Sequence, residues 1–217
     1  MFFPFDIERD DGVQDRQRFS VLVWSVMACC IGVHLILFVV QPESVRIDTF
    51  YRLGACRFRF AWWSPLTCVL VHGSWMHLLG NMYFLWLYGP PLEKRVGSLG
   101  FSVLFLSGAF VSVGAHVLTV SPLFADEPAI GASGAISTLL GAFLVLWPTA
   151  RLRCLLFPLV SLRPIMVQAP AYIVLGVWLA AQLVYTLKLV GDVAGVAFWA
   201  HVAGFAWGAA LAHVMQM

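Results

Sequence analysis

The chain has 217 residues, of which 61% are hydrophobic and 11% are charged, and its mean hydropathy is +0.87. Ordinary soluble domains carry about 25% charged residues, so this composition excludes a soluble globular domain and indicates a membrane protein. The formal net charge of +2 gives no sign of nucleic-acid binding, and no nucleic-acid partner is expected.

The charged residues are clustered and leave six uncharged stretches, 19–42, 60–92, 96–125, 128–150, 164–187 and 193–217. Each stretch holds the roughly 18 to 20 residues that an α-helix needs to cross about 30 Å of hydrocarbon. The sequence therefore predicts an all-α membrane protein with a six-transmembrane-helix domain, 19–217, after a charged N-terminal cytoplasmic tail, 1–18. The expected helices are approximately 19–41, 68–89, 97–119, 132–149, 169–188 and 193–215.

Lysine and arginine are divided unevenly between the two sides of this predicted bundle. With the N-terminus inside, eight lie in inner segments, namely Arg9, Arg16, Arg18, Lys94, Arg95, Arg151, Arg153 and Arg163. Five lie in outer segments, namely Arg46, Arg52, Arg57, Arg59 and Lys188. Cytoplasmic segments carry the excess of such residues, so an inside N-terminus is expected, although the four arginines of the first outer loop oppose it.

The five cysteines are Cys29, Cys30, Cys56, Cys68 and Cys154, and they show neither CxxC nor zinc-binding spacing, so no metal site is expected. Cys29 and Cys30 are interpreted as small packing residues of the first helix. Cys56 and Cys68 both fall near the first outer loop. A disulfide between them stays open, because the required geometry cannot be read from a sequence.

No Asp, Glu, Lys or Arg lies within the six uncharged stretches, so intramembrane chemistry must depend on other polar residues. Intramembrane ionisable residues are rare and often functional. Three histidines lack polar neighbours or lie near a helix end, and they are interpreted as structural or interfacial: His34, His116 and His213. By contrast, His77 and Asn81 share one helix face, with Ser74 and His72 towards its outer end. This polar face also fits hydrogen bonding to a neighbouring helix.

Two predicted helices have faces of small residues, which permit close packing. The last helix has Ala200, Gly204, Gly208 and Ala212 at intervals of four, beside His201, and the fourth has Ser133, Ser137 and Gly141. The fourth helix spans only about 24 Å, so the loop before it is expected to dip inward beside a water-filled cavity. His201 and His77 are expected at a similar depth, about 12 Å below the outer end of the last helix.

These polar groups suit nucleophilic catalysis. His201 can take the proton of the Ser133 hydroxyl and make it a nucleophile. Gly131 permits a tight turn before the fourth helix, and the N–H groups of its first turn, with His77 and Asn81, can hold a developing oxyanion. No intramembrane carboxylate is present to complete a triad, so the sequence predicts a Ser-His dyad.

Three motifs, on the second, fourth and sixth predicted helices, resemble the rhomboid family of intramembrane serine proteases. They are Gly131-Ala132-Ser133-Gly134 (GxSG), His77 to Asn81 preceded by His72 (HxxxN), and Ala200-His201 with Gly204 (AHxxG); "GPPLEKRVGS" also resembles an inner turn of the family. GxSG alone occurs in other hydrolase folds. The resemblance implies Ser133 as nucleophile, His201 as base, His77, Asn81 and the Ser133 N–H around the oxyanion, and His72, Gly131, Gly134 and Gly204 in support.

The resemblance, which is to a bacterial subset, also implies an endopeptidase without a cofactor in the bacterial inner membrane. Its partners would be membrane lipids and transmembrane substrates, cut near the outer end of a helix after sideways access between the second and fifth helices. Trp178, Gln182 and Tyr185 lie on the fifth helix, and none is assigned as a gate. Ser137 stands where many members have a tyrosine that stacks on the catalytic histidine, so the support of His201 must come from elsewhere. The oligomeric state is open.

Two other function classes remain. A catalytically inactive rhomboid-like protein that binds membrane clients would lack the serine or the histidine of the dyad, and this chain has both. A transporter or metal carrier using His72, His77 and His201 as ligands would be expected to show intramembrane carboxylates or metal-ligand spacing. The zinc-protease motif HExxH is absent.

Overall fold

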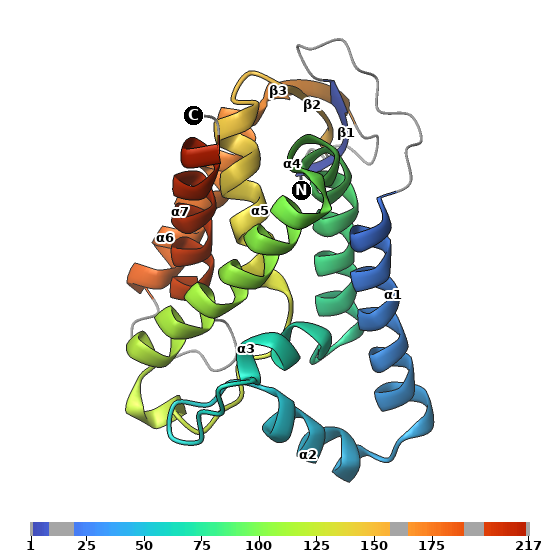
Figure 1. Ribbon diagram of the computed structural model, residues 1–217, viewed down its shortest axis with the longest axis vertical. Helices are drawn as coiled ribbons and strands as arrows, with labels where there is room; N and C mark the ends of the chain where they lie inside the picture. The colour runs from blue at the N-terminus through green and yellow to red at the C-terminus, as the bar shows by residue number, and fades with distance from the viewer. Residues whose placement is uncertain (1, 9–19, 157–164, 189–197, 216–217) are drawn as a thin grey trace.

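The computed structural model describes residues 2–8, 20–156, 165–188 and 198–215. These residues form a bundle of apolar helices with α1 on one side, α6 and α7 on the other, and α5 between them (Figure 1). The helices are α1 (Val21–Leu35), α2 (Glu43–Leu53), α3 (Ser64–Thr67), α4 (Trp75–Thr119), α5 (Ser133–Leu146), α6 (Ala171–Lys188) and α7 (Phe198–Met215). A π-helical turn, η1 (Ile36–Val40), extends α1, and two 3-10 turns, η2 (Cys68–Leu70) and η3 (Pro122–Phe124), precede α4 and α5.

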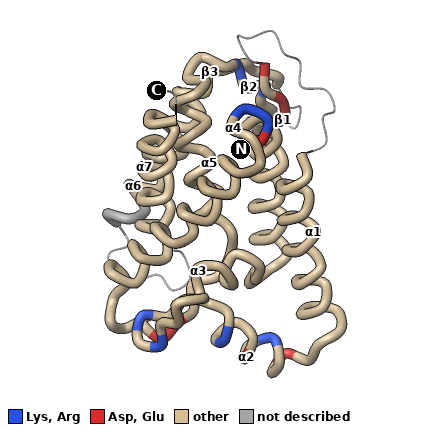
Figure 2. The backbone as a smooth tube through the Cα atoms, viewed as in Figure 1, with Lys and Arg blue, Asp and Glu red and all other residues tan. Residues whose placement is uncertain are grey.

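Charged residues of the described part of the chain lie at the two ends of the bundle and leave its middle uncharged (Figure 2). Two helical segments are long and apolar enough to cross a membrane, Val21–Val40 and Trp75–Thr119, and two shorter apolar helices are Ser133–Leu146 and Ala171–Val184. Large apolar side chains such as Val40 (71% exposed) and Leu99 (80% exposed) face outward, as a lipid environment requires. The fold is thus a mainly helical membrane bundle, whereas the count of six spans stays a prediction.

α4 combines the second and third predicted helices. It runs for 45 residues and bends at Gly97, whose φ of 73° and ψ of 168° are not helical. Glycine has no Cβ to oppose a positive φ, so the chain can reverse there and return along the bundle (Figure 1). The expected start at 68 is wrong. Residues 68–70 form η2, and α4 begins after Ser74, whose hydroxyl accepts a hydrogen bond from the His77 N–H at 3.1 Å.

A buried glutamate on α4 caps the beginning of α1. The Glu93 carboxylate accepts hydrogen bonds from the N–H groups of Leu22 and Val23, both at 3.1 Å, and from the Ser98 hydroxyl at 3.2 Å. First-turn N–H groups have no partner within their own helix, and Ser20 at the N-cap position makes no side-chain cap. Glu93 therefore supplies the cap from another helix and holds α1 against α4.

A three-stranded antiparallel sheet covers one end of the bundle. Its strands are β1 (Phe2–Glu8), β2 (Arg151–Leu156) and β3 (Ile165–Pro170), in that order. The N-terminal segment 1–18, expected as a charged tail, thus contains a strand over residues 2–8, while residues 9–19 lie outside the described residues. Arg153 lies 3.5 Å from Asp6 and 3.8 Å from Glu8, so charged side chains join β1 to β2.

The helices before and after β2 and β3 differ from their expected bounds, because residues 147–149 lie in a turn and residues 169–170 belong to β3. α5 ends at Leu146 rather than 149, and α6 begins at Ala171 rather than 169. The Ala171 N–H donates to the Ala150 carbonyl at 2.8 Å, which ties the start of α6 to the residue before β2. α7 begins at Phe198, and the expected residues 193–197 lie outside the described residues.

α5 and α7 pack backbone to backbone through glycines. A Cβ on Gly208 would overlap the Thr138 carbonyl, one on Gly141 would overlap the Phe205 carbonyl, and one on Gly204 would lie 2.5 Å from the Gly134 carbonyl oxygen. The two faces of small residues predicted from the sequence therefore do meet, but Gly204 and Gly208 oppose Gly134 and Thr138, each one position after a residue of the predicted row. Gly141 likewise opposes Phe205, one position after Gly204, and the Ser137 hydroxyl donates within its own helix to the Ser133 carbonyl, 2.7 Å away.

Candidate active site

Ser133 lies at the first position of α5, after a segment that is fixed to the rest of the bundle. Ala129 pairs with Ala55 through two backbone hydrogen bonds of 2.9 and 3.0 Å, and the Gly131 N–H donates to the Cys68 carbonyl at 2.9 Å. Gly131 has a φ of 108°, which side chains with a Cβ rarely adopt. Gly131, two residues before Ser133, thus permits the turn, and the backbone hydrogen bonds fix where α5 begins.

The close packing of α5 and α7 brings a serine and a histidine into contact. The Oγ atom of Ser133 lies 2.7 Å from the Nε2 atom of His201, a hydrogen-bonding distance. Both side chains are partly buried. Gly134 and Gly204 flank this pair and pack against the same residue, since a Cβ on either would meet Ser112 of α4 within 2.6 Å. Their lack of a side chain therefore permits the approach that joins Ser133 to His201.

A residue that the sequence left without a role contacts the other side of the imidazole. The Nδ1 atom of His201 lies 2.8 Å from the Oε1 atom of Gln182 on α6. The Trp178 ring, one turn earlier on α6, is centred 6.2 Å from the His201 ring, and the Phe198 ring is centred 6.4 Å away. Ser137 does not contact the imidazole through any described hydrogen bond and donates to Ser133 instead. The support of His201 therefore comes from α6, not from α5.

His77 and Asn81 converge on the turn before Ser133. An ideal Cβ on Gly131 would lie 2.5 Å from the Nε2 atom of His77 and 3.3 Å from the Nδ2 atom of Asn81. Asn81 is 7% exposed, and its Nδ2 group has no hydrogen-bond partner among the described residues. Leaving a buried donor without a partner costs free energy. The Asn81 Nδ2 group, next to the turn that leads to Ser133, can therefore donate a hydrogen bond to an anion that forms only during a reaction.

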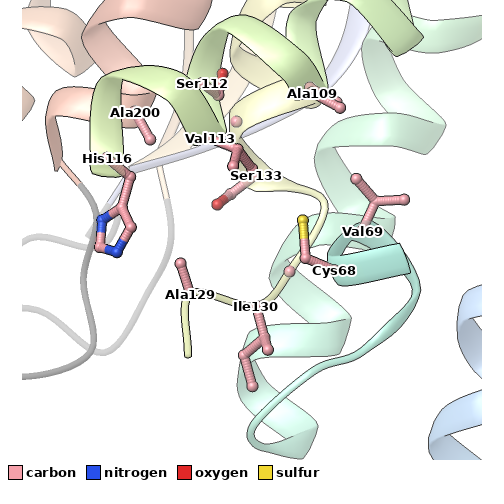
Figure 3. Close-up of a pocket in the computed structure, with 13 residues that line it drawn as sticks. Cys68, Val69, Ala109, Ser112, Val113, His116, Ala129, Ile130, Ser133 and Ala200 are labelled. Carbon is pink, nitrogen blue, oxygen red and sulfur yellow. The ribbon is translucent and has the colours of Figure 1, made fainter. Parts of the chain in front are cut away.

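A small cavity opens beside Ser133 between α4, α5, α7 and the segment before α5 (Figure 3). It measures about 40 Å³, room for a few water molecules at about 10 to 15 Å³ each. Its lining is mostly apolar, with polar side chains from Ser112, His116 and Ser133. His116, interpreted from the sequence as structural, thus faces the same cavity as Ser133. The cavity can hold water next to the serine within a largely apolar bundle.

The remaining candidate residues pack behind the site. His72 is fully buried. The centres of the His72 and His77 rings are 5.2 Å apart, and their planes meet edge to face at 73°, so His72 supports the orientation of His77. His34 stacks on Phe38 with ring centroids 4.0 Å apart. All five cysteines are free, so Cys56 and Cys68 do not pair. Within the described residues, no group of three or more His, Cys, Asp or Glu side chains could hold a metal ion.

Comparisons with known proteins agree on one family. Residues 59–217 match the family model described as Rhomboid domain. "Putative rhomboid protease YdcA" of Bacillus subtilis is 36% identical over 97 residues, which are 44% of this chain and 46% of that protein. "Rhomboid protease GlpG" of Salmonella paratyphi A is 27% identical over 126 residues, 58% of this chain and 44% of that protein.

A plant protein is similar to this chain as well. "Rhomboid-like protein 11, chloroplastic" of Arabidopsis thaliana is 27% identical over 133 residues, 61% of this chain and 44% of that protein. The chain thus spans less than half the length of these relatives in each alignment. The relatives occur in both bacteria and a plant organelle, so they do not by themselves assign this chain to one membrane.

Proposed function

This chain belongs to the rhomboid family of intramembrane proteases, and on that premise we propose that it is a serine endopeptidase that uses a dyad of Ser133 and His201. The observation that carries the proposal is the 2.7 Å separation of Ser133 Oγ and His201 Nε2. A serine hydroxyl is a weak nucleophile until a base takes its proton, and a neutral imidazole at this distance is such a base.

The proposed reaction has two halves. Ser133 Oγ attacks the carbonyl carbon of the scissile peptide while its proton passes to His201 Nε2, and the same proton then goes to the departing amine as the C–N bond breaks. Water next attacks the acyl-enzyme, His201 takes one proton of that water, and Ser133 Oγ regains a proton as it leaves. A carboxylate product and an amine product result, without a cofactor.

The oxyanion of each tetrahedral intermediate needs donors that are in place before the reaction. The Ser133 N–H is in the first turn of α5, where no intrahelical acceptor is available. His77 and Asn81 lie against Gly131, two residues before the nucleophile. We assign these three groups to the oxyanion, with His72 behind His77 and with Gly131, Gly134 and Gly204 permitting the close approach.

The substrate is proposed to be a transmembrane helix of another protein. Its carbonyls are hydrogen-bonded within the helix, so the scissile segment must unwind, and weak helix formers such as Gly and Pro should be favoured there. The chain is proposed to cross the membrane six times, as one membrane domain over 19–217, in a bacterial inner membrane with its N-terminus inside. The two groups of basic residues at opposite ends of the described bundle (Figure 2) are compatible with that arrangement.

Covalent labelling tests the nucleophile. A fluorophosphonate should modify the purified protein at Ser133, and Ser133→Ala should abolish both labelling and cleavage of a transmembrane reporter in liposomes while the fold stays intact. Ser137→Ala is the matched control, because it removes a hydroxyl from the next turn of α5 and should still be labelled. Cleavage by Ser133→Ala would contradict the assignment. A folded wild-type protein that neither labels nor cleaves would favour the inactive client-binding alternative.

A further inference from the structure

We propose that Gln182 of α6 is the positioning residue of His201, a neutral amide in the place that a carboxylate holds in a Ser-His-Asp triad. This inference rests on the proposed function, since it takes His201 to be the base. The geometry behind it is the 2.8 Å separation of His201 Nδ1 and Gln182 Oε1, on the side of the ring opposite the contact with Ser133.

The two contacts of the imidazole require one tautomer. To accept the Ser133 proton, Nε2 must carry a lone pair, so in the neutral ring the hydrogen sits on Nδ1. Nδ1 then needs an acceptor, and the amide oxygen of Gln182 is that acceptor. Without it the ring can adopt the other tautomer or rotate away, and either change removes the base from Ser133. A similar hydrogen bond fixes the tautomer in the well-known triad.

α6 presents Gln182 together with a second group that fixes the same ring. Trp178 and Gln182 are four residues apart and therefore share a helix face. The Trp178 ring stacks on Phe205 of α7, with centroids 6.0 Å apart at 28°, and lies 6.2 Å from His201. The aromatic contact thus holds the two helices in register at the position where Gln182 reaches the imidazole.

An amide suits this place better than a carboxylate. His201 has Ser133 of α5 and Gln182 of α6 at hydrogen-bonding distance and His77 of α4 as an electrostatic neighbour. α5, α6 and α7 contain no acidic residue over their described lengths. An ionised carboxylate within the bilayer is costly, whereas a neutral amide pays far less desolvation and still accepts from Nδ1. Gln182 therefore orients the base but adds no charge that would hold a proton on it.

Three substitutions at residue 182 test the role. Gln182→Ala and Gln182→Leu should lower kcat on the order of 100-fold with KM changed less than about twofold, because they disorient the base without removing a substrate contact. Gln182→Glu keeps an acceptor oxygen and should recover much of the loss. Leu183→Ala, at the neighbouring and 38% exposed position, is the matched control and should behave like the wild type.

The pH profile separates orientation from packing. kcat/KM of the wild type should rise with pH as the imidazole loses its proton, because only the neutral ring is a base. A glutamate at 182 favours the protonated ring, so the rising limb of Gln182→Glu should move to higher pH, by about 1 unit or more. Equal losses of kcat in Gln182→Ala and Gln182→Glu would make residue 182 a packing residue and overturn the inference.

The same set of variants separates this inference from the proposed function. Ser133→Ala is assayed beside the residue-182 variants. Cleavage by Ser133→Ala would remove the dyad itself. If Ser133→Ala were inactive and Gln182→Leu fully active, the dyad proposal would stand and only the role of Gln182 would be refuted. Fluorophosphonate labelling provides a second readout, since Gln182→Ala should label Ser133 more slowly than Leu183→Ala does.

Discussion

The glycine contact between α5 and α7 predicts a large effect from a single methyl group. Gly208→Ala adds a Cβ that would overlap the Thr138 carbonyl oxygen and would lie 2.6 Å from the carbonyl carbon and 2.9 Å from the Cα atom of Thr138. All three atoms are backbone, so no rotamer change can make room. The two helices must separate instead.

The separation can be estimated from the contact distances. Ordinary carbon contacts are about 3.5 to 4.0 Å, so moving the new Cβ clear of the Thr138 carbonyl carbon and Cα atom alone requires a shift of roughly 1 Å. The same shift would stretch the 2.7 Å link between Ser133 and His201 to about 3.7 Å, beyond hydrogen-bonding distance. We therefore expect a loss of about 1 to 3 kcal/mol in stability and on the order of 100-fold in kcat.

Thermal unfolding and reporter cleavage in the same detergent measure both effects. Gly32→Ala is the matched control, because a Cβ at Gly32 of α1 meets nothing within 4 Å. That change should raise stability by about 0.4 to 1 kcal/mol and leave cleavage unaltered. If Gly208→Ala melted and cleaved like the wild type, α5 and α7 would not pack through this contact, and the reasoning from the glycines would be refuted.

Two further predictions concern buried polar groups. Asn81→Ala should lower kcat by roughly 10- to 1000-fold, because the proposed role of its Nδ2 group is in the transition state. The change should cost little stability, because that group has no partner among the described residues. A loss confined to KM would contradict this role. Glu93→Ala should lower the free energy of unfolding by about 1 to 3 kcal/mol, because it leaves the Leu22 and Val23 N–H groups uncapped. Glu43→Ala removes the 74% exposed partner of the Arg46 ion pair and should cost less than about 1 kcal/mol. Equal melting of the two variants would exclude the capping role of Glu93.

The helices could be predicted where a local pattern determines them, and the sheet could not. The start expected for the fourth helix, 132, lies within one residue of the observed Ser133, since the glycine-rich turn marks it. β1 has no comparable local signal. Its partner β2 lies more than 140 residues later in the chain, and strand stability depends on such cross-strand neighbours rather than on the segment itself. The charged residues near β1 therefore suggested a tail.

The same distinction applies to the site. His77 with Asn81 and Ser133 with Gly134 are near neighbours in sequence, so helix geometry alone places each pair together. Gln182 reaches His201 from another helix, and periodicity does not specify how α6 is rotated about its own axis. The four-residue spacing of Trp178 and Gln182 could have indicated a shared face, but not that this face meets α7.

The position of Gln182 also makes the orientation of His201 depend on where α6 lies. The proposed nucleophile Ser133 is on α5, the proposed base His201 is on α7, and Gln182, which contacts that imidazole, is on α6. α5 is held to α7 by backbone contact at Gly141 and Gly208, so this pair cannot adjust without separating. α6 is held at its start by the hydrogen bond from the Ala171 N–H to the Ala150 carbonyl, beside the sheet. A displacement of α6 would therefore disturb the contact of the imidazole with Gln182 before it disturbed Ser133, which makes the orientation of His201 the part of the candidate site most sensitive to where α6 lies.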